Sequence, residues 1–323
     1  MSYTLTVPIG FGREPKIIAA LSVPISNGVI DFDCFAEDLE RTANYGIEPA
    51  VLMDTYQINH CTLDQQVRGL EVTRDVMAGR PFTAGVYVED ELTGAAPEDM
   101  ISAYRKKIEI LEGQYGASPI IFQTEGLKEA DSGTVIRVYN GMAEASRGGL
   151  KAFELSPVFA PNGWMFPENA LVEILADDKW DGAKHSSLDP SKEWVLLQKI
   201  RKLGKRLYTG NDYDFASMIF YGSDALLGIA TFIPDKFREL ANALRDGDEN
   251  AFFKLATQME FLGRVAFQTP VPAYKHGASM VKNMRGWYPT DDLLPNNPFT
   301  RDGVHRKELK DALHYLGIET TSE

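Results

Sequence analysis

The sequence contains little cysteine and little histidine. Only two of its 323 residues are cysteines, Cys34 and Cys61, and five are histidines. The two cysteines lack the spacing of a metal site and are too few for a disulfide framework, so we expect a reducing compartment, the cytoplasm. Asp54, Asn59, His60 and Cys61 form only a loose polar cluster, whose members are too close in sequence to favour a metal site.

Long apolar runs and a surplus of basic residues are also missing. No apolar stretch approaches the roughly 20 residues of a membrane span, and the first residues show no signal-peptide pattern. The 46 acidic residues outnumber the 33 basic ones, which gives a net charge of -13. This charge argues against nucleic acid and anionic membranes as partners, so a small molecule is the expected ligand.

What the sequence does contain is a repeat of short apolar strand, turn and amphipathic helix. Eight near-continuous apolar runs predict strands at Ile17 to Pro24, Pro49 to Met53, Phe82 to Val88, Pro119 to Gln123, Leu150 to Leu155, Gly182 to His185, Arg206 to Gly210 and Asp224 to Ala230. Strands of this kind are buried on both faces, and each is followed by a helical pattern. This order predicts an α/β fold, a (β/α)₈ barrel over residues 1–247. The alternative, a doubly wound sheet, lacks a glycine-rich dinucleotide turn after its first strand.

Three further helical patterns follow the predicted barrel without strand partners. They span Glu249 to Phe267, Pro272 to Met284 and His305 to Leu316. We therefore expect a C-terminal helical extension over residues 248–323. Within it, the polar stretch Tyr274 to His276 is expected on a solvated or interface face of its helix.

A lysine stands at the end of the sixth predicted strand, where the active site of such a barrel lies. Lys184 is the one cation among the strand-end candidates, which include Asp54, Glu154 and Asp212. Burial depresses the pKa of an amine and turns it into a nucleophile towards a carbonyl, whereas neighbouring carboxylates keep it charged. An ordinary strand-end lysine that reaches water is the simpler alternative. The sequence leaves these possibilities open.

Several short motifs resemble those of the dihydrodipicolinate synthase and N-acetylneuraminate lyase family. Gly182-Ala183-Lys184 resembles the G-[IV]-K segment of that family, and Tyr208 to Asp212 is similar to its SGDD stretch. The segments Pro24 to Asp31, Gly222 to Gly228 and Thr269 to Pro272 resemble its first loop, its eighth-strand glycine stretch and its NPIPV motif. The resemblance implies a class I aldolase-type enzyme on a (β/α)₈ barrel, in which Lys184 forms a Schiff base with a 2-oxo acid.

The sequence departs from that family at three places. Met53 to Gln57 replaces the GTTGE segment that holds the pyruvyl carboxylate, and Gly126-Leu127 replaces a tyrosine pair. Glu154 to Pro157 replaces YNVP, so that Glu154 stands where the acid/base tyrosine is expected, and no arginine follows it. A true dihydrodipicolinate synthase is therefore not expected.

These observations lead to a prediction for each candidate residue. We expect Lys184 to be the nucleophile and Glu154 to be a general acid/base, with a counter-ion for Lys184 as the alternative role for Glu154. His185 follows Lys184 directly and is expected to point to the other face and to pack. The residues expected to contact substrate are Asp54, Thr55, Ser186, Gly210, Asn211, Asp212 and Gly228.

The favoured function is that of a lysine-dependent lyase, aldolase or dehydratase acting on a small 2-oxo acid or related carbonyl compound. The imine supplies the electron sink, so neither a cofactor nor a metal is expected. The alternative is a barrel that has lost its chemistry and binds a small ligand as a sensor or regulatory protein. Metal-assisted hydrolysis has no ligand spacing to support it. The resemblance further implies a homo-oligomer, either a tetramer or a dimer.

Overall fold

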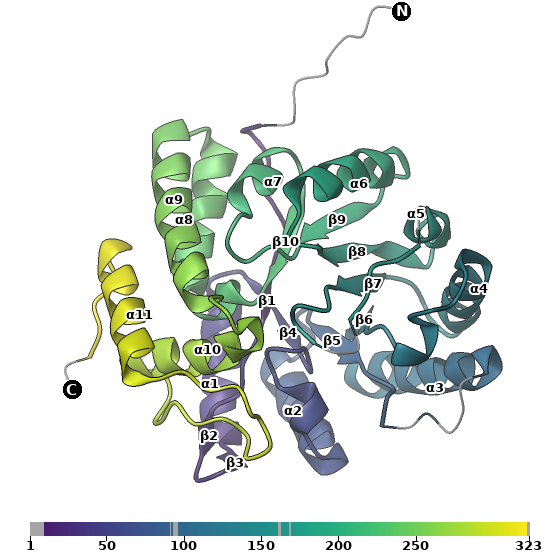
Figure 1. Ribbon diagram of the computed structural model, residues 1–323, viewed down its shortest axis with the longest axis horizontal. Helices are drawn as coiled ribbons and strands as arrows, with labels where there is room; N and C mark the ends of the chain where they lie inside the picture. Colours follow the sequence, from purple (N-terminus) through teal and green to yellow (C-terminus); the bar gives the residue numbers. More distant parts are fainter. Residues whose placement is uncertain (1–9, 91, 93–95, 161–162, 168, 322–323) are drawn as a thin grey trace, which may run out of the picture.

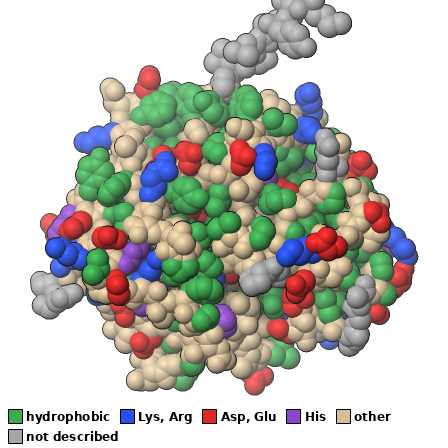
Figure 2. All heavy atoms as spheres, in the orientation of Figure 1, with side chains coloured by type: hydrophobic (Ala, Val, Ile, Leu, Met, Phe, Trp, Pro, Cys, Tyr) green, Lys and Arg blue, Asp and Glu red, His purple; other side chains and the backbone are tan. Residues whose placement is uncertain are grey.

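The structure is a computed structural model that describes residues 10–90, 92, 96–160, 163–167 and 169–321. Residues 1–9 lie outside this description, and the expectation of no signal peptide falls on them. In the described part of the chain, no helix is both long enough and apolar enough to cross a membrane. Basic side chains are interspersed with acidic ones over the face shown in Figure 2.

Eight parallel strands close into a barrel, as predicted. Around the barrel their order is β1, β10, β9, β8, β7, β6, β5 and β4. Their bounds are β1 Ile17–Ala20, β4 Glu48–Val51, β5 Thr83–Val86, β6 Ser118–Ile121, β7 Leu150–Leu155, β8 Trp180–Ser186, β9 Arg206–Thr209 and β10 Asp224–Leu227. A two-stranded hairpin, β2 Ile25–Ser26 with β3 Val29–Ile30, turns at Asn27 and Gly28, where φ is 53° and 77°. Two successive positive φ angles suit an Asn-Gly turn.

Helices surround the barrel and follow its strands (Figure 1). They are α1 Phe32–Asn44, α2 Leu63–Met77, α3 Pro97–Ile110, α4 Ser132–Ala143, α5 Ala170–Ile174, α6 Pro190–Lys202, α7 Ala216–Phe220 and α8 Pro234–Asp246. Helix α3 continues as a π-helical turn, Leu111–Tyr115, and α5 is only five residues long. The eighth strand ends at Leu227 because the chain turns into a 3-10 helix, Ile229–Thr231.

Local sequence signals explain where helix α6 begins, just after the strand that carries Lys184. Asp189 is the N-cap, and its carboxylate accepts hydrogen bonds from the backbone N–H groups of Ser191 and Lys192. Pro190 follows at the first helical position, where a missing N–H has no cost. A cap of this kind contributes about 1 kcal/mol to helix stability. The cap and the proline therefore define where the chain turns from β8 into α6.

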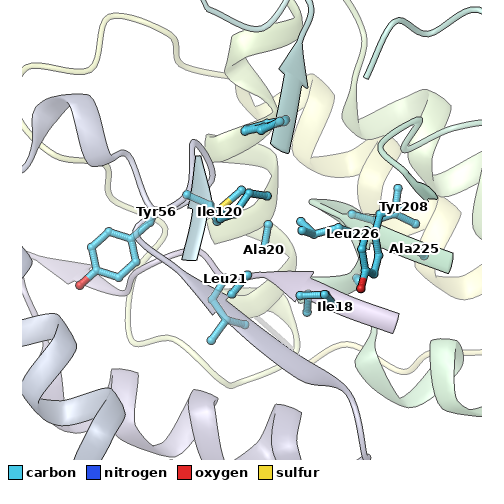
Figure 3. Close-up of a cluster of buried hydrophobic side chains, with 14 of the residues drawn as sticks. Ile18, Ala20, Leu21, Tyr56, Ile120, Tyr208, Ala225 and Leu226 are labelled. Atoms are coloured by element: carbon cyan, nitrogen blue, oxygen red, sulfur yellow. The ribbon is translucent and has the colours of Figure 1, made fainter. Parts of the chain in front are cut away.

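The barrel interior is filled by apolar side chains, among them Ile18, Ala20, Ile120 and Leu226 (Figure 3). Tyr56 points away from this group (Figure 3), and its hydroxyl lies against Gly69 of α2. A Cβ on Gly69 of α2 would lie only 2.1 Å from the Tyr56 hydroxyl, so a glycine is required for this approach. The core therefore continues between the sheet and its surrounding helices.

The C-terminal part is helical, as predicted, and consists of α9 Glu249–Ala266, α10 Tyr274–Met284 and α11 Gly303–Tyr315. These helices lie together beside α8 and α1 (Figure 1, green to yellow). A buried ion pair between Lys282 of α10 and Asp38 of α1 fixes α10 on the barrel. The hydroxyl of Tyr288 also contacts Lys282, at 3.1 Å, and donates to the backbone oxygen of Ser22 at 3.0 Å. Helix α10 is therefore held against the end of β1.

Candidate active site

A small cavity lies at the carboxyl ends of the barrel strands. Its free volume is about 10 Å³, close to the minimum that holds one water molecule. The lining residues come from the ends of five strands, from the β7–α5 loop and from the start of α10. They are Met53, Asp54, Thr55, Phe153, Leu155, Phe159, Lys184, Ser186, Gly210, Asp212, Gly228 and Tyr274. The cavity is thus closely packed, and its lining side chains must move apart to admit a ligand larger than water.

Lys184 is one of these lining residues and is only 7% exposed. Burial lowers the pKa of its amine to about 8, although the charges of Asp212 and Asp54 oppose that shift. Its Nζ lies 4.5 Å from the centroid of the Phe153 ring. Within the described part of the chain, neither a hydrogen bond nor an ion pair engages this amine. An unpaired buried amine is available to attack a carbonyl group.

Gly210 and Ser186 give the lysine side chain its room. A Cβ on Gly210 would lie 2.1 Å from the Ser186 hydroxyl and 3.0 Å from Cε of Lys184. The Ser186 side chain is buried, and its hydroxyl has no hydrogen-bond partner among the described residues. A buried hydroxyl without a partner is costly, so this group is suited to bind a polar atom of a ligand.

Asp212 places a second charge in the cavity. Burial raises the pKa of its carboxyl to about 6, while Lys184 and hydrogen bonds from the backbone of Ile229 and Gly228 counteract that rise. The N–H of Ile229 donates to Oδ1 of Asp212 at 2.7 Å. At pH 7 the carboxylate is therefore mostly ionised and is fixed in place near the lysine.

Asp54 and Thr55 meet the first two residues of α10. The hydroxyl of Tyr274 donates to Oδ2 of Asp54 at 2.9 Å and lies 2.9 Å from Oγ1 of Thr55. Nζ of Lys275 lies 3.0 Å from the same carboxylate oxygen. Tyr274 and Lys275 are 3% and 5% exposed, so the expectation of a solvated or interface helix face is wrong. Helix α10 instead begins inside the barrel mouth.

Glu154 does not lie beside Lys184, and the prediction of its position is wrong. Phe153 and Leu155 line the cavity, so the intervening Glu154 points to the outside of the barrel wall. There its Oε2 lies 2.5 Å from Nδ1 of His185, and its Oε1 accepts the N–H of Phe166 at 3.0 Å. Its contacts are those of a buried carboxylate between β7, β8 and the loop after β7.

His185 points away from Lys184, as predicted. Burial lowers the pKa of its imidazole, but the hydrogen bond and the charge of Glu154 raise the pKa by more than burial lowers it, so the net shift is upward. Burial also raises the pKa of the neighbouring Glu193 to about 7. This polar group lies behind the barrel wall, separate from the cavity.

Asn211 was predicted to contact substrate, but like Glu154 it does not line the cavity. It is buried, and its amide oxygen accepts the N–H of Tyr213 at 3.4 Å, which stabilises the turn after β9. The remaining predicted contacts all line the cavity together with Lys184. They are Asp54, Thr55, Ser186, Gly210, Asp212 and Gly228.

Three aromatic residues of the cavity were not predicted as site residues. Side chains alternate between the two faces along β7, so Phe153 points into the cavity once its neighbour Glu154 is placed on the outer face. Phe159 and Tyr274 come from segments outside the strand ends and had no sequence signal that points to the mouth. Among the described residues, no group of three or more His, Cys, Asp or Glu side chains is arranged to hold a metal ion.

The sequence model of one protein family, described as "Protein of unknown function (DUF993)", matches residues 17–312. The chain belongs to the DUF993 family. No curated protein matches the sequence. The family assignment thus covers the barrel and most of the C-terminal helices, and it carries no activity with it.

Solved structures show which fold this DUF993 protein shares. YagE, a prophage protein of the dihydrodipicolinic acid synthase family from E. coli K12 in complex with pyruvate, matches with a TM-score of 0.79 and 15% identity over 94% of this chain and 99% of that chain. Dihydrodipicolinate synthase from Bacteroides thetaiotaomicron matches with a TM-score of 0.76 and 15% identity over 96% and 99%. The chloride-inhibited synthase from Acinetobacter baumannii, complexed with pyruvate, matches with 0.73 and 16% over 94% and 99%. The predicted resemblance is confirmed as a shared fold at low identity.

Proposed function

We propose that this protein is a Schiff-base-forming lyase, aldolase or dehydratase acting on a small 2-oxo acid or related carbonyl compound. The observation that carries the proposal is the buried amine of Lys184 at the end of β8, with its pKa lowered to about 8. With that pKa, about a tenth of the molecules carry the neutral amine at pH 7, which is enough to attack a carbonyl.

The first step joins Nζ of Lys184 to the carbonyl carbon, and the carbonyl oxygen leaves as water with one proton from the amine and one from a general acid, while the nitrogen keeps its second proton. The protonated imine that results is a cation, and the ionised carboxylate of Asp212 lies in the same cavity to stabilise it. The iminium then accepts the electron pair of an adjacent C–C or C–H bond. The hydroxyl of Ser186 is available to bind a polar atom of the substrate.

The charges of the cavity bear on the substrate. Lys184 is the cation among the residues that line it, and Asp54 and Asp212 are carboxylates. Asp54 is paired with Lys275, so a free carboxylate on the substrate would meet the like charge of Asp212, whereas a hydroxyl group would find an acceptor there. We therefore expect hydroxylated aldehydes and ketones to react more readily than pyruvate, which two of the structural relatives bind.

The test is reductive trapping with borohydride. The protein is incubated with pyruvate, other 2-oxo acids, dihydroxyacetone and glyceraldehyde, reduced, and weighed by mass spectrometry. We expect an added mass that is absent from Lys184→Ala. If no compound adds mass while a known lysine-dependent aldolase reacts, the chemistry is refuted, and a ligand-binding role for the barrel takes its place.

A further inference from the structure

A catalytic lysine needs a partner that moves protons, and Glu154 is on the wrong side of the barrel wall for this task. The lining of the cavity offers a different hydroxyl, that of Tyr274, which α10 brings in from the C-terminal part. The Tyr274 ring is held by stacking on Phe267, with centroids 4.4 Å apart and an interplanar angle of 14°. Phe159 contacts its edge at 6.3 Å.

The end of β10 is shaped to admit this ring. A Cβ on Gly228 would lie 3.1 Å from Cε2 of Tyr274 and 3.3 Å from Oδ1 of Asp212. Gly228 therefore allows the phenol to lie close to the strand ends that carry the reacting groups. The ring position depends on contacts from Gly228 after β10, from Phe159 in the β7–α5 loop and from Phe267 at the end of α9.

The hydrogen bonds of the phenol have a defined direction. Tyr274 has one proton, which it donates to Asp54, so the hydroxyl of Thr55 donates to the phenol oxygen. Nζ of Lys275 lies 3.0 Å from Asp54 and neutralises its charge. Asp54 therefore accepts the hydrogen bond of the phenol without being an uncompensated buried charge. Burial raises the pKa of Tyr274 well above its usual value, and Asp54 and Asp212 add to that rise, so the phenol is neutral at rest.

We propose that Tyr274 is the residue that transfers protons to and from the substrate bound to Lys184, with Thr55 and Asp54 holding its hydroxyl and Lys275 pairing with Asp54. This inference rests on the function proposed above. Proton transfer is thereby assigned to a residue of the C-terminal helices and not to a residue on a barrel strand.

The proton and electron balance closes without another reactant. The phenol gives its proton to the hydroxyl of the carbinolamine, whose C–O bond breaks to release water as the nitrogen lone pair forms the iminium. The phenolate, stabilised by the new cation, then removes a proton from the carbon next to the iminium. The C–H electrons form a C=C bond, the iminium becomes a neutral enamine, and the phenol is restored.

The experiment measures adduct formation and proton removal separately. Pyruvate and dihydroxyacetone serve as probes, borohydride trapping measures the adduct on Lys184, and exchange of the α-hydrogens in D₂O is followed by proton NMR. Tyr274→Phe should still form the adduct at equilibrium but should lose exchange by about 100-fold or more, the usual contribution of general acid–base catalysis. Lys184→Ala gives the background rate.

Tyr139→Phe in α4 is the matched control, because it removes an equally buried tyrosine hydroxyl that is not among the lining residues and has no hydrogen-bond partner among the described residues. It should keep both adduct and exchange. If Tyr274→Phe forms the adduct and exchanges at the wild-type rate, the role of Tyr274 is overturned while the Schiff base stands. If neither probe labels Lys184 in the wild type, the proposed function fails, and the role of Tyr274 fails with it.

A second variant covers the case in which Tyr274→Phe does not fold. A fluorinated tyrosine at position 274 keeps the hydroxyl and its hydrogen bonds but makes the phenol more acidic. The exchange rate should change with the acidity of the phenol, since proton transfer follows its pKa. An unchanged rate would overturn the assignment, because a purely structural hydroxyl is insensitive to this substitution.

Discussion

The hydroxyl of Tyr274 lies 2.9 Å from the carboxylate of Asp54, although the two residues are 220 positions apart in the sequence. This contact joins the start of α10 to the loop after β4 and completes the wall of the cavity around Lys184. The C-terminal helices are therefore part of the candidate active site as well as a cover on one side of the barrel. The chemistry proposed here depends on both parts of the chain.

The pH dependence of trapping should follow the ionisation of Lys184. Burial lowers the pKa of Lys184 to about 8, and only the neutral amine attacks. The initial rate of adduct formation with dihydroxyacetone should therefore rise with pH, with a midpoint near 8, and then level off. Trapping with cyanoborohydride across pH 6 to 10 measures this profile, and a midpoint near the ordinary lysine value of about 10.4 would contradict the assignment.

Asp212→Asn supplies the internal control for that profile. The charge of Asp212 raises the pKa of Lys184, so its removal should move the midpoint to lower pH. The iminium also loses its counter-ion, and we expect less adduct at equilibrium. A midpoint that moves upward would show that Asp212 does not act on the amine.

Glu154→Gln should spare the chemistry and weaken the fold. Glu154 contacts His185 at 2.5 Å behind the barrel wall, so trapping on Lys184 should stay within about threefold of wild type. The free energy of unfolding, measured by urea titration, should fall by about 1–3 kcal/mol because a charged buried hydrogen bond is lost. A loss of trapping of 100-fold or more in a folded variant would restore Glu154 to the active site.

The pH dependence of that stability loss has a definite sign. Burial lowers the pKa of His185, but the contribution of Glu154 is opposite in sign and larger, so the pKa of His185 is raised overall. A raised pKa contributes stability that is complete below the unfolded value of about 6.5 and is lost as pH rises through the folded value. The part of the difference between wild type and Glu154→Gln that comes from His185 should therefore be largest at low pH and shrink as pH rises.

Gly210→Ala should reduce trapping by crowding the lysine. Its Cβ would lie 2.1 Å from Oγ of Ser186 and 3.0 Å from Cε of Lys184. We expect at least a tenfold loss of adduct, with a stability cost of about 1–3 kcal/mol from overpacking. Gly113→Ala is the matched control, since a Cβ there meets nothing within 4 Å, and it should trap as wild type does.

The sequence predicted the barrel because local and long-range signals agree. Eight apolar runs with helical patterns between them fit few other topologies, and turn residues such as Asn27 and Gly28 set the boundaries. The position of Lys184 at a strand end followed from the same pattern. Barrel geometry then brought Gly210, Asp212 and Gly228 towards it.

The orientation of Glu154 could not be predicted with the same certainty. All six residues of β7 are buried, so no alternation of polar and apolar residues shows which face is the interior. The neighbouring Phe153 and Leu155 suit either side of the wall. The resemblance to a family motif predicted Glu154 in the site, but its side chain points to the outer face of the barrel wall, towards His185.

Tyr274 lies beyond what the strand pattern reveals. It is the first residue of α10, and its burial depends on how the helices after the barrel pack, which involves Lys282 with Asp38 and Tyr288 with Ser22. These contacts join segments more than 200 positions apart. From the sequence alone, the polar side chains of Tyr274 and Lys275 are compatible with a solvated surface. Only the fold shows that Asp54 is their partner.

The most direct test is to ask which buried lysine reacts. Lys151 has a pKa that burial also lowers to about 8, but it lies at the amino end of β7, where its Nζ donates to Ser118 at 2.6 Å. Borohydride trapping with dihydroxyacetone and pyruvate, followed by peptide mapping, compares the two lysines within one molecule. We predict an adduct on Lys184 and none on Lys151. An adduct on Lys151 alone, or equal labelling of both lysines, would contradict an active site at the carboxyl ends of the strands.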